Sequence, residues 1–382
     1  MRNISLVAAL ACFTATVHGQ DPSWRAESSL FWSSDKRDLA YRNIEKIYPT
    51  HTVRASSKVK RLEIGEPLAV GIDMEAYVRE QHVAGLIILH RGKVVLEKYA
   101  RGYDASGRWL SQSVAKSVTS MLVGAAIQDG AISSVDDPIT KYLPEMKGSA
   151  YDGVTMRQVL AMTSGVKWNE DYTDPNSDVA KYGRQEPEDG LDIAVAYMRK
   201  LPREAQPGTK WAYKTGETHL IGAVLRRATG KTLADYLTEK IWQPYGMERD
   251  AVWQLNKSGT ELSGCCMAVS LRDYARFGQF VIEGGRAQGK QVVPEKYLLE
   301  ATRKQADIGV EGRGYGFQWW TLDDGSFFAV GIFGQSIFID SKRQLVIATS
   351  GNWPVATDRV KLQPARLEFF RTVQAAVDRG SK

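Results

Sequence analysis

The residues best suited to chemistry form a Ser-x-x-Lys pair, in which a hydroxyl precedes an amine by three positions. This spacing occurs four times, at Ser33/Lys36, Ser57/Lys60, Ser113/Lys116 and Ser164/Lys167. Only Ser113 begins a long stretch with an apolar helical stripe, on which residues three apart share one face. A lysine withdrawn from water has a lowered pKa and can accept the serine proton as a neutral amine. Ser113 and Lys116 are thus a candidate nucleophile and base, although an N-cap serine beside a solvated lysine would give the same local pattern.

Such a pair also needs a group that passes a proton to the leaving atom, and a tyrosine can do this. Tyr213 is the candidate, because it lies in a loop rich in turn residues, 207–216, directly before a predicted helix. It is one of 16 tyrosines, most of which have structural roles, so its position alone does not assign the function.

Other catalytic signatures are missing from the sequence, including Gly-x-Ser-x-Gly, the P-loop, His-Glu-x-x-His and Gly-x-Gly-x-x-Gly. The 5 histidines have no partners at metal-ligand spacing, and 3 cysteines cannot build a disulfide scaffold or a four-ligand metal site. We therefore expect no metal and no cofactor. Cys265 and Cys266 are adjacent, and a bond between neighbouring cysteines demands unusual backbone geometry, so we expect two separate buried thiols.

The elements that must position these groups alternate between strand-rich ends and a helical middle. Strands are expected over 83–90 and 93–100, joined as a hairpin at Arg91-Gly92, and over 326–333, 335–340 and 344–349. Helices are expected over 113–129, 217–229, 233–242 (closed by Pro244), 270–283 (with Ser270 as N-cap) and 358–379.

The simplest architecture for this order of strands and helices is α+β, with one antiparallel sheet built from both chain ends and flanked by helices. It predicts an α/β lobe of about 21–112 and 266–382, and an inserted, mainly helical lobe of about 113–265. The polar and mixed stretch 21–70 is expected to wrap the surface.

Composition limits the class of protein. With 382 residues, 43% hydrophobic and 25% charged, the chain can bury an enzyme-sized core and is not disordered, collagen-like or a coiled coil. It has no internal run of about 18 apolar residues, so we expect no transmembrane span. The net charge of +6 comes from scattered basic residues, which argues against nucleic-acid binding.

Residues 1–20 have the pattern of a signal peptide: Arg2, an apolar stretch over 4–12, and small residues up to Gly19. The mature domain would then span 21–382, in an exported, periplasmic or secreted protein. Cys12 weakly resembles a lipoprotein cleavage site, but Ala9 occupies the position where a large aliphatic residue is usual, which argues against lipidation.

The chain resembles the serine hydrolases of the class C β-lactamase, DD-peptidase and family VIII esterase group over about 80–382. Ser113-Val114-Ala115-Lys116 resembles the first motif of that group. Further similar stretches follow in the same order, at 135–145, 160–165 (with Met162 in place of histidine), 207–213, 220–222, 229–231 and 244–247. The resemblance implies a β-lactamase/transpeptidase-like fold, with Ser113 as the acylated nucleophile, Lys116 as the base and Tyr213 as the proton shuttle.

Two departures from the group's pattern bear on the substrate. Thr215 stands where the second motif has asparagine, and Ala329-Val330-Gly331 replaces the third motif, Lys- or His-Thr-Gly. In β-lactamases and DD-peptidases the third motif helps to bind the substrate carboxylate. Loss of its cation weakens recognition of that acid and argues against β-lactam hydrolysis.

A narrower resemblance is to the 6-aminohexanoate-dimer hydrolases, which cleave linear amides and carboxylic esters. It rests on 169–177 and 331–335. It implies that Tyr172 assists amide cleavage, that Trp168 and Gly331 contribute to substrate binding, and that the backbone N–H groups of Ser113 and Ile332 form the oxyanion hole. Loop anchoring is the alternative for Tyr172 and Trp168. An acidic substrate contact of that group falls at Gly183 here, which favours a general esterase or amidase.

The sequence therefore predicts a serine hydrolase that cleaves a small-molecule ester or linear amide through an acyl-enzyme. Two alternatives stay open: a β-lactamase or DD-peptidase, and a non-catalytic, penicillin-binding-like sensor lobe.

Overall fold

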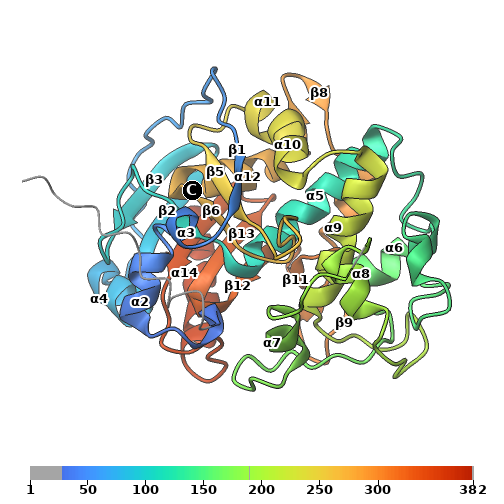
Figure 1. The fold of residues 1–382 in the computed structure, drawn as a ribbon. Helices are drawn as coiled ribbons and strands as arrows, with labels where there is room; N and C mark the ends of the chain where they lie inside the picture. Colours follow the sequence, from blue (N-terminus) through green and yellow to red (C-terminus); the bar gives the residue numbers. More distant parts are fainter. Residues whose placement is uncertain (1–27, 189, 381–382) are drawn as a thin grey trace, which may run out of the picture.

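A central antiparallel sheet organises the fold, which a computed structural model describes for residues 28–188 and 190–380 (Figure 1). The sheet has eight strands in the order β3-β2-β14-β13-β12-β11-β10-β9. Their bounds are β2 Val83–His90, β3 Lys93–Tyr99, β9 Ala306–Asp307, β10 Arg313–Tyr315, β11 Trp320–Leu322, β12 Phe327–Gly331, β13 Gln335–Asp340 and β14 Leu345–Gly351. The expected hairpin and the pairing of both chain ends in one sheet are confirmed.

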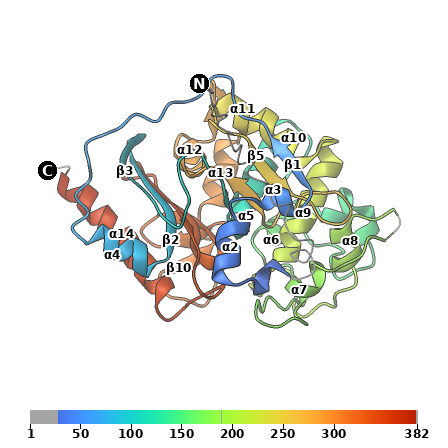
Figure 2. The same cartoon turned by 60° about the vertical axis from the view of Figure 1, so that its left-hand side comes forward.

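Both faces of this sheet are buried, because side chains along a strand alternate in direction. In β2, Ile87 and Leu89 belong to the larger core, which includes α12 (Leu271–Ile282). Leu86 and Ile88 belong to a second core on the opposite face, with α4 (Met74–Glu80) and α14 (Leu362–Gly380). Figure 2 shows α4 and α14 together on the outer side of β2 and β3.

The middle of the chain is mainly helical and lies to one side of the sheet (Figure 1). Its helices are α5 Ala115–Gln128, α6 Met156–Leu160, α7 Asp178–Tyr182, α8 Ile193–Met198, α9 Thr215–Thr229 and α10 Leu233–Leu237. The expected apolar stripe of helix α5 is buried, and the remaining faces of the helix are buried as well, from Ala115 to Ala126. Small residues such as Ala, Ser and Gly let the surrounding elements approach it closely; a Cβ on Gly124 would meet Val293 Cγ1 at 2.6 Å. The two-lobe boundaries stay a prediction.

The predicted N-cap of one helix is confirmed, and the predicted end of another is wrong. Ser270 caps α12 as expected, because its side chain accepts a hydrogen bond from the Asp273 N–H at 3.1 Å. Pro244 does not close the third helix. The chain continues through a π-helical turn, η5 Thr238–Trp242, into α11 Gln243–Tyr245, and ends at Gly246 with φ +87°. Proline fits near the start of this last short helix, where no intrahelical donor is required.

Residues 54–69 contain no buried side chain and follow the surface as expected, but the segment 28–53 does not. It forms α2 (Ser34–Ala40), α3 (Ile44–Ile47) and β1 (Thr50–Val53), with Trp32 and Tyr41 buried. The buried positions 37, 40, 41, 44 and 47 recur at helical spacing, a pattern that the many polar neighbours obscure. β1 joins a second sheet in the order β1-β5-β6-β4, with β4 Trp109–Leu110, β5 Ala251–Gln254 and β6 Met267–Val269.

The remaining elements are short. They are α13 (Glu295–Ala301), the hairpin of β7 (Arg286–Ala287) and β8 (Lys290–Gln291), and 3-10 turns such as η2 (Gln112–Val114) and η6 (Ile332–Gly334). None of the helices in residues 28–188 and 190–380 combines the length and apolarity that crossing a membrane requires. The predicted signal peptide, 1–20, lies outside the described residues.

Candidate active site

Ser113 lies in η2, the turn that leads from β4 into α5, and this turn is firmly held. Ser111 donates its N–H to the Met267 carbonyl at 2.6 Å and accepts the Met267 N–H at its hydroxyl, at 3.1 Å. Gln112 adopts φ +45°, in the left-handed region that a side chain other than glycine rarely takes. Its amide donates to the Tyr41 hydroxyl at 2.7 Å. Rare backbone conformations of this kind gather at functional sites, where the surroundings enforce them.

Lys116 lies one turn further along and points at Ser113. Its Nζ donates to Ser113 Oγ at 3.1 Å, to Thr215 Oγ1 at 3.0 Å and to the Gly264 carbonyl at 2.7 Å. The side chain is 1% exposed, and burial lowers its pKa to about 8, while the negative charge of Glu170 acts in the opposite direction. The predicted pairing of hydroxyl and desolvated amine is therefore present in the geometry.

The three other Ser-x-x-Lys pairs are arranged differently. The Ser33 hydroxyl accepts a backbone N–H as the N-cap of α2, Lys60 forms an ion pair with Glu283, and the Ser164 hydroxyl donates to Glu217. Only the pair at Ser113 combines a buried amine with a hydroxyl on the wall of a cavity.

Tyr213 lies over the same lysine, with its ring centroid 5.1 Å from Lys116 Nζ. The ring stacks on Trp320, with centroids 5.7 Å apart, and meets Tyr315 edge-on. Burial and the charge of Glu170 raise the pKa of the phenol far above its usual value, which keeps it protonated at neutral pH. Ser113, Lys116 and Tyr213 thus come together as the sequence predicts.

Glu170 connects the loop over the site to the lysine, and the sequence reasoning missed it. Its carboxylate accepts the Thr215 N–H at 2.9 Å, the Tyr172 hydroxyl at 2.8 Å, and also the Thr215 hydroxyl and the Trp168 indole N–H. Because Thr215 accepts from Lys116, a chain of hydrogen bonds runs from Glu170 to the amine. The only signal in the sequence is one acidic residue among several in the stretch 169–177.

The predicted substrate residues occupy different positions. Tyr172, Gly331 and Ile332 line the cavity that holds Ser113, whereas Trp168 does not. Trp168 donates its indole N–H to Glu170, and its ring is edge-on to Tyr197. Gly183, the position expected to have lost an acidic contact, is the C-cap of α7 and also lies off the cavity wall.

The cavity has a volume of about 520 Å³ and is lined largely by aromatic and aliphatic groups. Its aromatic wall carries Trp211, Tyr213, Trp320 and Trp353. Its polar and charged lining residues include Ser113, Glu170, Asp171, Arg359 and Arg366. Gly331, at the end of β12, lets that strand approach the nucleophile, because a Cβ there would meet the Ser111 carbonyl oxygen at 2.5 Å. Three or more His, Cys, Asp or Glu side chains do not gather as metal ligands anywhere in the described part of the chain.

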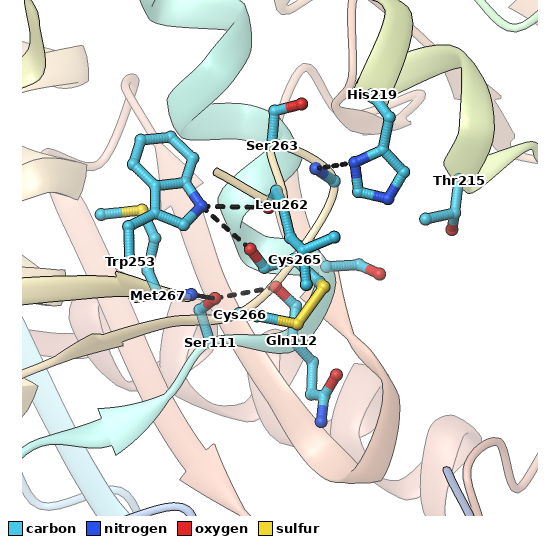
Figure 3. Close-up of a disulfide and its surroundings, with 12 residues drawn as sticks. Ser111, Gln112, Thr215, His219, Trp253, Leu262, Ser263, Cys265, Cys266 and Met267 are labelled. Carbon is cyan, nitrogen blue, oxygen red and sulfur yellow. Dashed lines mark hydrogen bonds between the residues drawn. A yellow bond between two sulfur atoms is a disulfide. The ribbon is translucent and has the colours of Figure 1, made fainter. Parts of the chain in front are cut away.

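The expectation of two free thiols at Cys265 and Cys266 is wrong, because the two form a disulfide (Figure 3). Cys266 adopts φ +73°, so the backbone turns sharply at this step and the neighbouring side chains can meet. The bridge directly follows Gly264, whose carbonyl accepts from Lys116 and whose N–H donates to His219 Nδ1 at 3.3 Å. The disulfide is therefore part of the loop that holds the lysine.

Comparison with known proteins identifies the family. The model of the Beta-lactamase family matches residues 73–369, and the chain belongs to this family of serine hydrolases. A 6-aminohexanoate-dimer hydrolase of Paenarthrobacter ureafaciens is 31% identical, over 74% of this chain and 76% of that protein. Esterase EstB of Burkholderia gladioli is 28% identical, over 44% of this chain and 47% of its own length.

Among solved structures, a Bacillus anthracis protein provisionally assigned as a 6-aminohexanoate-dimer hydrolase has the same fold. It is superposed with a TM-score of 0.79 at 21% identity and covers 90% of this chain and 94% of its own. The expected β-lactamase/transpeptidase-like α+β fold and the expected family are confirmed.

Proposed function

We propose that this serine hydrolase cleaves carboxylic esters and linear amides through an acyl-enzyme formed on Ser113. The observation that carries the proposal is the 3.1 Å contact between Lys116 Nζ and Ser113 Oγ, at a lysine whose pKa burial lowers to about 8. The family, and the similarity to a 6-aminohexanoate-dimer hydrolase and to an esterase, support the same substrate class.

The reaction starts with proton transfer from Ser113 to neutral Lys116, and Ser113 Oγ attacks the substrate carbonyl. The N–H groups of Ser113 and Ile332 stabilise the oxyanion, at the start of a helix whose dipole favours negative charge there. Tyr213, which stays protonated at neutral pH, gives its proton to the leaving alcohol or amine and recovers one from the Lys116 ammonium. Water then attacks the acyl-enzyme and releases the acid.

Glu170 and Thr215 support this cycle by holding Lys116 in place. Thr215 takes the position of the asparagine in the second motif, and it keeps a hydrogen-bond acceptor on the amine at 3.0 Å. Tyr172 presents its hydroxyl to Glu170 from the cavity wall, where a substrate amide can contact it.

A substrate panel tests the proposal. Wild type, Ser113→Ala and Ser57→Ala are assayed with p-nitrophenyl esters, linear amides and nitrocefin. Ser57→Ala is the matched control, because Ser57 belongs to another Ser-x-x-Lys pair and is exposed. We expect ester and amide hydrolysis in wild type and control, and none in folded Ser113→Ala. Nitrocefin turnover at ordinary enzyme rates would instead indicate a β-lactamase, and absence of all turnover would indicate a non-catalytic lobe.

We also propose export from the cytoplasm, supported by the charge and apolar pattern of residues 1–20. N-terminal sequencing of the natively produced protein checks this proposal. A new N-terminus near residue 20 is expected, and retention of Met1 would contradict it.

A further inference from the structure

Gly264 connects the amine of Lys116 to a second buried side chain, His219. Its carbonyl accepts the shortest of the three hydrogen bonds from Lys116 Nζ, at 2.7 Å, and its N–H donates to His219 Nδ1 at 3.3 Å. Figure 3 shows the His219 ring facing this loop, from the helix that also carries Thr215. His219 does not line the cavity that holds Ser113, so it is connected to the site through Gly264.

The direction of the Gly264 carbonyl depends on anchors outside the residue, because glycine permits more backbone conformations than other residues do. The preceding peptide group is held at both ends: the Ser263 carbonyl accepts from Thr119 Oγ1 at 2.8 Å, and the Gly264 N–H donates to His219. With that planar group fixed, only the two backbone dihedral angles of Gly264 remain to set the direction of its carbonyl. The histidine therefore restricts where this acceptor of Lys116 can point.

Packing fixes the His219 ring itself. The residue is 3% exposed, and its ring stacks on Tyr182 of α7, with centroids 4.4 Å apart and an angle of 5° between the planes. In α9, His219 follows Thr215 by four positions, so the two side chains lie on one face of the helix. Thr215 Oγ1 accepts from Lys116 at 3.0 Å. One helix face therefore supplies the lysine with a direct acceptor and with the anchor of a second acceptor.

The His219 ring has to be neutral to act as this anchor. Nδ1 accepts the Gly264 N–H and so carries no proton, which leaves the proton of the neutral ring on Nε2. Burial, together with the positive charges of Lys116 on α5 and Arg226 on α9, lowers the pKa of His219 well below 6.5. Arg226 itself forms an ion pair with Asp192. At neutral pH the imidazole thus accepts a hydrogen bond and adds no positive charge beside the lysine.

We propose that His219 is a positioning residue for the general base: its Nδ1 holds Gly264 so that the Gly264 carbonyl keeps the Lys116 amine directed at Ser113. The inference rests on the proposed function, in which Lys116 takes the proton of Ser113. A carbonyl accepts a stronger hydrogen bond from an ammonium than from a neutral amine, so the anchored carbonyl favours the charged lysine. Loss of the anchor should therefore lower both the rate of hydrolysis and the pH at which the rate rises.

Three variants separate this anchor from general packing. His219→Phe keeps a flat ring against Tyr182 but removes the acceptor, whereas His219→Asn places an amide oxygen close to the position of Nδ1. Val224→Ala is the control, because it weakens the packing of the same helix at a buried apolar side chain that cannot hydrogen-bond to the loop. The measured quantities are kcat/KM for a neutral p-nitrophenyl ester between pH 6 and 10, and the unfolding temperature.

In folded His219→Phe we expect the plateau of kcat/KM to fall about tenfold, which corresponds to the free energy of one hydrogen bond to a charged group. The rise of kcat/KM should move to lower pH by about one unit, because the ammonium loses an acceptor. His219→Asn should lie closer to wild type in both respects, and Val224→Ala should lower only the unfolding temperature. An unchanged plateau and midpoint in folded His219→Phe, or the same two changes in Val224→Ala, would overturn the proposal.

A measurement on wild type needs no turnover and does not depend on the folding of a His219 variant. The ring nitrogens of nitrogen-15-labelled histidine are followed by NMR between pH 6 and 10, and His219 is assigned by substituting the other histidines one at a time. We expect a neutral ring with its proton on Nε2 throughout, whose signals shift near pH 8 as Lys116 titrates and do not shift there in Lys116→Met.

A ring with its proton on Nδ1, or one that is charged at pH 7, would contradict the anchor. Loss of ester hydrolysis with the expected signals retained would count only against the proposed chemistry.

Discussion

The pH dependence of ester hydrolysis follows from the burial of Lys116. Its amine acts as a base only when neutral, and its pKa is about 8. The neutral fraction is then about one in eleven at pH 7 and about ten in eleven at pH 9, so kcat/KM should rise about tenfold and level off. A lysine with the ordinary pKa of about 10.4 would give a rise of about 100-fold over the same interval, with no plateau. The phenol of Tyr213, whose pKa is raised far above 10, adds no second change in this range.

The assay is kcat/KM for a neutral p-nitrophenyl ester between pH 6 and 10, because this parameter reports the ionisation of the free enzyme. A rate independent of pH, or one still rising tenfold per unit above pH 9, would refute the reasoning. Stability gives a second readout. The folded pKa of Lys116, about 8, is below the reference value of 10.5, so unfolding takes up a proton between these values. The free energy of unfolding should therefore rise with pH across that window, by about 3 kcal/mol at most, and Lys116→Met should lack this rise.

Three further predictions concern the same site. Tyr213→Phe should slow ester hydrolysis by about 10²–10⁴-fold without lowering the unfolding temperature, and a wild-type rate would remove the tyrosine from the proton path. Glu170→Gln removes the negative charge that raises the pKa of Lys116, so the rise of kcat/KM with pH should move to lower pH. A move to higher pH would contradict the electrostatic interaction between Glu170 and Lys116. Replacing Cys265 and Cys266 by serine should loosen the loop whose Gly264 carbonyl accepts a hydrogen bond from Lys116. We expect kcat/KM to fall by up to about tenfold, which corresponds to the free energy of one hydrogen bond. Unchanged kinetics in the folded variant would show that the loop keeps its conformation without the disulfide.

The features that the sequence predicts well are those decided by neighbours along the chain. Ser113 and Lys116 face each other because three residues make about one helical turn. The hairpin at Arg91-Gly92 and the cap at Ser270 depend on local backbone preferences in the same way. That strands from both chain ends join one antiparallel sheet follows from these local elements together with the family resemblance, whereas the order of the strands in it is seen only in the structure.

The rest of the site comes from distant segments, which a periodicity pattern does not bring together. The acceptors of Lys116 are 99 residues away, at Thr215, and 148 residues away, at Gly264. Glu170 is one acidic residue of a loop rich in them, and its role appears only when the loop folds over Thr215. Arg366 belongs to a helix whose other charged residues are mostly solvated, so its burial beside Trp353 is visible only in the fold.

The expectation for Cys265 and Cys266 failed for a related reason. The general reluctance of adjacent cysteines to bridge reflects the backbone that most segments adopt. Here Cys266 takes a left-handed backbone conformation. On one side of it the Cys265 carbonyl accepts the Trp253 indole N–H at 3.1 Å, and on the other side Met267 pairs with Ser111. These tertiary contacts flank a turn that no pattern in the neighbouring residues predicts.

Covalent labelling tests the central claim most directly, because it asks whether Ser113 is a nucleophile made reactive by Lys116. Folded wild type is treated with a fluorophosphonate, and the adduct is located by peptide mass spectrometry. We predict one adduct per chain, on Ser113, whose rate of formation falls at least 100-fold in folded Lys116→Met. An unlabelled Ser113 in folded wild type, or labelling at the same rate without the lysine, would contradict the account.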